Sequence, residues 1–129
     1  MGTVLICDDE PLVASALARL ATRAGLTPII DTSSQQVVEL AKQRRPDVII
    51  LDVRQRIDGR DLLASLKRDP ETRDIKVVML SAVEDQFMRR VCLELGAADY
   101  EVKPFDGTFM TRIKRLAGDA PLSSDAPAG

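Results

Sequence analysis

The chain has 129 residues, a formal net charge of −2, no histidine, no tryptophan and two cysteines. This length suits one domain with a sizeable core, and the low net charge and scarce aromatic side chains argue against direct nucleic-acid binding. The lack of histidine excludes serine-hydrolase triads and histidine-based acid–base catalysis. No apolar run approaches the ~20 residues that span a bilayer, so we expect a cytoplasmic protein with no membrane partner.

Short apolar runs alternate with segments of helical periodicity along most of the chain, a pattern typical of repeated strand–helix units. The expected strands are residues 4–7, 27–30, 48–51, 75–80 and 98–102, and the expected helices end near residues 24, 44, 68, 95 and 116. Right-handed crossovers between parallel strands then give an α/β fold with helices on both faces of the sheet. We predict one folded domain over residues 1–117 and a disordered tail or linker over 118–129.

Polar residues and apolar spacing predict where the helices begin and which faces they bury. Thr32, Ser33 and Ser34 are candidate N-caps for the second helix. Leu12 belongs to the apolar spacing of the first helix, and either Phe87 or Met88 is expected on the inner face of the fourth.

Residues that could act on a phosphate follow four of the predicted strands. Asp8 and Asp9 follow the first strand, Asp52 the third, Ser81 the fourth and Lys103 the fifth. In an open α/β sheet, ligands bind beyond the carboxyl ends of the strands, so these side chains are expected to converge there. Neighbouring carboxylates repel one another, and such a cluster therefore calls for a divalent cation.

This ordered set of strand-end residues resembles the receiver domain of two-component response regulators, over roughly residues 3–117. The resemblance implies a flavodoxin-like (βα)5 fold, doubly wound, with strand order 2-1-3-4-5. It implies that Asp52 is the phosphoacceptor, since a carboxylate can form an aspartyl phosphate. It also implies that Asp8, Asp9, Asp52 and the backbone carbonyl of Arg54 hold Mg²⁺, a hard ion that prefers oxygen ligands.

The resemblance assigns roles to three further positions. Lys103 would pair with the acyl-phosphate oxygens, and the Lys103–Pro104 peptide bond is expected to be cis. Ser81 would hydrogen-bond the phosphoryl group, and Tyr100 would swing inward behind it. Together they would shift the surface formed by the fourth helix, fifth strand and fifth helix.

The resemblance also implies partners and limits the chemistry. The phosphodonor would be a histidine kinase, a phosphotransfer protein or a small phosphodonor, and the reader a downstream protein or an output domain. A homodimer formed on phosphorylation is a further expected partner. The chain would not be an enzyme beyond Mg²⁺-dependent phosphorylation and dephosphorylation of its own Asp52.

The loop after Asp52 departs from the family pattern. Receivers usually carry a Met-Pro pair there and a turn glycine eight positions on, whereas here Gly59 lies seven positions on and the loop contains Arg54 and Arg56. We hypothesise that Arg54 reaches toward the acids and partly replaces, or competes with, the metal. An ordinary solvated pair of arginines is the alternative.

The residues allow two alternative functions to be compared with this one. A receiver-like interaction module that signals without phosphorylation remains open because of the unusual loop. A phosphohydrolase of the haloacid-dehalogenase type needs Asp-x-Asp, and Arg54 occupies its second acid position. Because a guanidinium cannot donate a proton at neutral pH, the hydrolase interpretation is poor.

Overall fold

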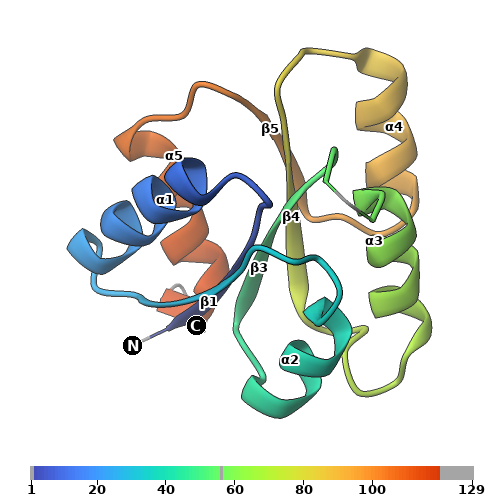
Figure 1. Ribbon diagram of the computed structural model, residues 1–129, viewed down its shortest axis with the longest axis horizontal. Coiled ribbons are helices and arrows are strands. Elements are labelled where there is room, and N and C mark those ends of the chain that lie inside the picture. Colours follow the sequence, from blue (N-terminus) through green and yellow to red (C-terminus); the bar gives the residue numbers. More distant parts are fainter. Residues whose placement is uncertain (1, 56, 120–129) are drawn as a thin grey trace, which may run out of the picture.

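A five-stranded parallel sheet runs through the computed structural model, which describes residues 2–55 and 57–119 (Figure 1). The strand order is β2-β1-β3-β4-β5, which confirms the predicted flavodoxin-like α/β fold. In chain order the elements are β1 (Thr3–Cys7), α1 (Pro11–Arg23), β2 (Thr27–Asp31), α2 (Val37–Arg44), β3 (Val48–Asp52), α3 (Gly59–Arg68), β4 (Lys76–Ser81), α4 (Gln86–Glu94), β5 (Asp99–Val102), α5 (Gly107–Lys114) and a final turn, η1 (Arg115–Asp119).

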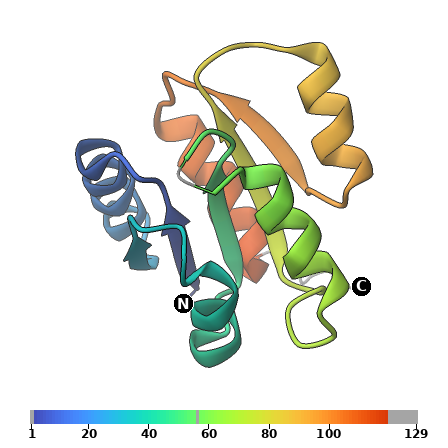
Figure 2. The ribbon, with the colours of Figure 1, turned by 45° about the vertical axis from the view of Figure 1, so that its right-hand side comes forward.

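The sheet is buried between two helical layers. Helices α1 and α5 cover one face, and α2, α3 and α4 cover the other (Figures 1 and 2). Because neighbouring residues of a strand point to opposite faces, β3 contributes Val48 and Ile50 to the first layer and Ile49 and Leu51 to the second. Burial on both faces explains why the three central strands, β1, β3 and β4, contain continuous apolar runs.

Aspartate side chains cap three of the helices. Asp58 accepts a hydrogen bond from Arg60 N at the start of α3, and Asp85 accepts one from Met88 N at the start of α4. Asp106 accepts from Thr108 N at the start of α5. Each cap satisfies an amide that the first helical turn leaves unpaired, and so fixes where the helix begins.

The predicted start of the second helix was wrong. The helix begins at Val37, after the candidate caps, because those residues form a turn of their own. The carboxylate of Asp31 accepts hydrogen bonds from the amide and the hydroxyl of Ser33, at 2.9 and 2.7 Å. Ser34 is buried with a φ of 60°, and its Oγ accepts a bond from Ile57 N. A residue in this left-handed conformation cannot continue a helix.

The structure shows which residues of α1 and α4 face the core. Leu12 is 86% exposed, so its predicted place in the core was wrong; α1 buries Ala14, Leu17 and Ala21 instead. On α4, Met88 packs against the core and Phe87 is 71% exposed, which selects Met88 from the two predicted alternatives.

The predicted tail begins within the last described turn. Gly118 and Asp119 belong to η1, and residues 120–129 lie outside the described residues. Within residues 2–55 and 57–119, no helix has the length and apolar character needed to cross a membrane.

Candidate functional site

The carboxyl ends of four adjacent strands place the predicted side chains at one edge of the sheet. Cys7 pairs with Leu51, so Asp8 follows β1 beside Asp52 at the end of β3. Ser81 ends β4 opposite Val102, and Lys103 is the next residue after β5. The backbone amide of Lys103 donates to Ser81 O at 2.8 Å, and the Lys103–Pro104 peptide bond is cis.

Three carboxylates gather at this edge. One ligand oxygen from each of Asp8, Glu10 and Asp52 lies within 4.8 Å of the others. Asp8 and Asp52 are buried, whereas Glu10 is exposed. The amide of Glu10 donates to Asp8 Oδ1 at 2.9 Å, which turns the chain and brings the Glu10 side chain back to the cluster. This all-oxygen donor set fits a hard cation such as Mg²⁺.

Glu10 is not among the metal ligands predicted from the sequence, whereas Asp9, which is among them, lies outside this group of acids. Asp9 is exposed and does not belong to this group of acids among the described residues. The only signal for Glu10 in the sequence is that it lies two residues after Asp8, a spacing that a turn closes. No property of the carboxylates themselves distinguishes Glu10 from Asp9.

The Lys103 ammonium lies among the acids. Its Nζ is 3.4 Å from Asp8 Oδ2, 3.5 Å from Glu10 Oε1 and 3.6 Å from Asp52 Oδ2. Burial alone would lower the pKa of Lys103, but the charges of Asp52 and Asp8 outweigh it and raise that pKa. Lys103 therefore stays cationic and offsets part of the repulsion among the carboxylates.

The carboxyl group of Asp52 has a strongly raised pKa. Burial and the neighbouring charge of Asp8 raise the pKa of Asp52 to about 6. Lys103 and a hydrogen bond from Arg54 N, at 3.2 Å, oppose this rise. A cation bound at the same oxygens would favour the ionised form, which is the nucleophilic one.

The hydroxyl of Ser81 is held within its own loop. Ser81 is buried, and its Oγ donates to Val83 O at 3.0 Å and accepts from Val83 N at 3.3 Å. A hydroxyl can rotate to another acceptor at low cost, so these bonds do not lock the Ser81 side chain.

Tyr100 lies behind this edge, in the core layer beneath α4. The residue is 2% exposed, and its Oη has no hydrogen-bond partner in the part of the chain that the structure describes. Tyr100 and Ser81 are therefore not hydrogen-bonded to each other. The guanidinium carbon of Arg89, on α4, lies 4.9 Å from the centre of the ring.

The short loop after Asp52 is closed by backbone contacts. Val53 N donates to Leu80 O, and Gly59 N donates to Val53 O, both at 2.9 Å. A Cβ at Gly59 would lie 2.4 Å from Asp52 O, so this approach requires glycine. The missing residue of the loop is thus accommodated by close backbone packing against the end of β3.

The loop side chains line a hollow of about 410 Å³ beside α4. Its lining residues are Val53, Arg54, Gln55, Asp58, Arg60 and Met88. The Arg54 side chain is exposed and forms no ion pair with the acids among the described residues, so the hypothesis that it competes with a metal gains no support from these contacts. Arg56, the second arginine, lies outside the described residues.

Comparison with known proteins identifies a family that the chain matches and relatives that it resembles. Residues 4–114 match the family described as the response regulator receiver domain. The chain is 35% identical over 128 residues to the phosphate regulon transcriptional regulatory protein PhoB of Pseudomonas aeruginosa, covering 97% of this chain and 56% of that protein. It is also 37% identical over 112 residues to a protein-glutamate methylesterase/protein-glutamine glutaminase of Archaeoglobus fulgidus, covering 83% of this chain and 31% of that protein.

A solved structure extends the comparison to three dimensions. A crystal structure of a response regulator from Chloroflexus aurantiacus has a TM-score of 0.84 and 30% identity, and the match covers 90% of this chain and 97% of that one. The chain belongs to the response regulator receiver domain family. Such domains are signalling domains of two-component systems. The chain spans 56% of the length of the first curated relative named above and 31% of the second.

Proposed function

We propose that the chain is a phosphorylation-controlled switch in which Asp52 accepts a phosphoryl group from a histidine kinase, a phosphotransfer protein or a small phosphodonor. The observation that carries this proposal is the setting of Asp52. Its buried carboxylate ends β3 with Lys103 Nζ 3.6 Å away and two further acids beside it. This arrangement offers a nucleophile, a fixed cation and an oxygen-rich cation site within one small region.

The chemistry is a displacement at phosphorus. A carboxylate oxygen of Asp52 attacks the phosphorus atom while the bond to the donor's nitrogen or oxygen breaks, and the leaving group takes that electron pair. The product is an acyl phosphate on Asp52. Lys103 then pairs with the phosphoryl oxygens, which its strong positive charge favours. Mg²⁺, when bound, supplies the charge that lets an anionic donor approach an anionic nucleophile.

The proposed metal site combines the observed cluster with the family assignment. Asp8, Glu10 and Asp52 supply carboxylate oxygens close enough to share one ion. Asp9 and the backbone carbonyl of Arg54 are added from the family resemblance. An octahedral ion that keeps some of its waters needs only part of this set from the protein.

The proposed output is a shift of the surface formed by α4, β5 and α5, which a downstream protein, an output domain or a second copy of the chain would contact. Rotation of the Ser81 hydroxyl toward the phosphoryl group would release Val83 O, at the beginning of the loop that leads to α4. The relatives named above act in transcription and in glutamate methylester chemistry, so the output is proposed only as far as this surface. A cytoplasmic location stays a prediction of the sequence.

A receiver that signals without phosphorylation is the alternative. The observation that favours it is the shortened loop after Asp52, together with a Tyr100 side chain that is already buried. In that case the α4 surface would bind its partner regardless of the state of Asp52.

Intact mass spectrometry separates the two functions. The protein is incubated with a small acyl phosphate, with Mg²⁺ or with EDTA. The switch gains the mass of one phosphoryl group, and only with Mg²⁺. An unchanged mass in both samples would support the phosphorylation-independent module.

A further inference from the structure

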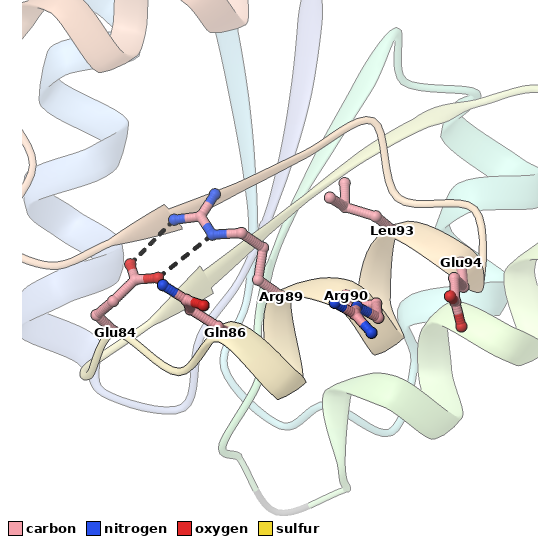
Figure 3. Close-up of a pocket in the computed structure, with 6 residues that line it drawn as sticks. All are labelled: Glu84, Gln86, Arg89, Arg90, Leu93 and Glu94. Carbon is pink, nitrogen blue, oxygen red and sulfur yellow. Dashed lines mark hydrogen bonds and ion pairs between the residues drawn. The ribbon is translucent and has the colours of Figure 1, made fainter.

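Arg89 makes two contacts with Tyr100 and an ion pair with Glu84. Its guanidinium lies over the Tyr100 ring, and its Nη1 donates to the backbone carbonyl of the same residue at 3.1 Å. On its other side it pairs with Glu84, through Nη2 to Oε1 at 3.0 Å and Nε to Oε2 at 3.4 Å. Figure 3 shows Glu84 and Arg89 reaching toward each other from the two sides of the first turn of α4.

These contacts fix the guanidinium in one orientation. A bidentate pair with a carboxylate holds the plane of the arginine head group, and a held plane loses less entropy when it stacks on a ring. The cation above the ring adds an attraction that an apolar side chain at this position would lack. Arg89 therefore links the loop after β4, through Glu84, to the middle of β5.

Tyr100 itself has no hydrogen bond that would fix its side chain. Its Oη is buried without a partner among the described residues. A buried hydroxyl without a partner disfavours the inward position, so another interaction must offset that cost. Within the described part of the chain, the ring contact with Arg89 is the polar interaction available to do so.

We propose that Glu84 and Arg89 form a latch that holds Tyr100 in its buried position through contacts that do not involve Asp52. This goes beyond the proposed function, and it differs from the expectation of the family resemblance that Tyr100 swings inward as a consequence of phosphorylation. With this latch, the Tyr100 side chain is already buried before phosphorylation. Phosphorylation then acts on the Ser81 hydroxyl and on the loop that follows it. Arg89 is thus a positioning residue for Tyr100.

The sequence provides a direct probe of this latch. Tyr100 is the only tyrosine, and the chain has no tryptophan, so tyrosine fluorescence reports Tyr100 alone. Acrylamide quenches this fluorescence only where the ring is accessible. The measurement is made on the full chain without a phosphodonor. Its result is therefore independent of whether Asp52 is phosphorylated, which mass spectrometry tests separately.

Four proteins are compared: the wild type, Arg89→Ala, Glu84→Gln and Arg90→Ala. Arg90 is exposed, lies next to Arg89, and lines with Glu84 and Arg89 a second pocket, on α4 (Figure 3), which makes it the matched control. We expect weak quenching in the wild type and in Arg90→Ala, a several-fold larger quenching constant in Arg89→Ala, and an intermediate value in Glu84→Gln. Far-ultraviolet circular dichroism checks that each variant remains folded.

Two results would overturn the proposal. One is equal quenching in the wild type and Arg89→Ala, because the ring would then stay buried without the guanidinium. The other is strong quenching in the wild type itself, because Tyr100 would then be outward in solution. If Arg89→Ala fails to fold, Glu84→Gln decides alone, since Glu84 is an exposed side chain; wild-type quenching in that variant would contradict the latch.

Discussion

The Nζ atom of Lys103 lies 3.6 Å from Oδ2 of Asp52, although 51 positions separate the two residues in the chain. The approach follows from the sheet topology, since β3 and β5 both flank β4 and end at the same edge. Lys103 is within 3.5 Å of Asp8 and Glu10 as well, so its positive charge would compete with that of a metal ion for these carboxylates.

The first prediction concerns this competition. Lys103→Met should raise the affinity for Mg²⁺ several-fold, by ~1 kcal/mol, because the acids lose their internal cation. The same variant should accept phosphoryl groups more slowly, because the phosphoryl oxygens lose their partner. Equilibrium dialysis or calorimetry with Mg²⁺ measures the affinity. Lys76→Met, an exposed lysine at the other end of the sheet, is the control, and an unchanged or weaker affinity in Lys103→Met would contradict the prediction.

The second prediction concerns the effect of the buried Asp52 charge on the stability of the fold. The raised pKa of Asp52 means that its charged form is disfavoured in the fold, first by burial and then by Asp8. In EDTA at neutral pH, Asp52→Asn should therefore increase the free energy of unfolding by ~1–2 kcal/mol. Urea unfolding measures this, with Asp74→Asn on the exposed surface as the control.

In Mg²⁺, the order of stability of the wild type and Asp52→Asn should be reversed. An ion that binds the native state raises the stability of the wild type by mass action. Asp52→Asn, which lacks one of the three clustered carboxylates, should gain clearly less stability in Mg²⁺ than the wild type does. An equal gain in both proteins would mean that Asp52 is not a ligand.

The third prediction concerns the pH dependence at the start of α3. The side-chain hydrogen bond from Arg60 lowers the pKa of Asp58, which also caps the helix. A carboxyl whose folded pKa is depressed stabilises the fold above its unfolded value, near 3.9, and loses that contribution as the pH falls through the folded value. Asp58→Ala should cost ~1 kcal/mol at pH 7, mainly through the lost cap.

Asp58→Asn separates the cap from the charge. Asparagine keeps an oxygen that can cap the helix, so this variant should be less destabilised than Asp58→Ala. Its difference from the wild type should shrink as the pH is lowered below about 4, where the native aspartate also becomes neutral. Unfolding curves at several pH values measure this, and a difference that does not vary with pH would contradict the assignment.

The fourth prediction concerns the short loop after Asp52. Gly59→Ala would place a Cβ 2.4 Å from Asp52 O and 2.9 Å from Val53 Cα, so the backbone must move. We expect a loss of ~2–3 kcal/mol, as for overpacked positions, and slower phosphoryl acceptance because the end of β3 is displaced. Gly107→Ala is the matched control: nothing lies within 4 Å of its added Cβ, and stability should be unchanged or higher.

The fold could be predicted from the sequence because each buried strand is a continuous apolar run. Strand ends are strong landmarks in such a sheet, so Asp8, Asp52, Ser81 and Lys103 could be expected at one edge before any coordinates were known. The family resemblance supplied the strand order, and the structure confirms it.

What the sequence did not predict depends on turns and on the packing of helices. Glu10 joins the acids through a turn closed by Asp8, and the Asp31 turn delays the start of α2. The contact between Arg89 and Tyr100 joins α4 to β5, and it depends on where α4 lies on the sheet. Helical periodicity indicates which face of a helix is buried but not which residue of another element it meets.

The most direct test of Asp52 as the phosphoacceptor is to locate the phosphoryl group. The protein is treated with Mg²⁺ and a small acyl phosphate, digested, and analysed by fragmentation mass spectrometry, with Asp52→Asn treated in parallel. If Asp52 is the phosphoacceptor, one phosphoryl group is expected on the peptide that contains Asp52 and none in the variant. A phosphoryl group on Asp8 or Asp9, or equal labelling of the wild type and Asp52→Asn, would contradict this assignment.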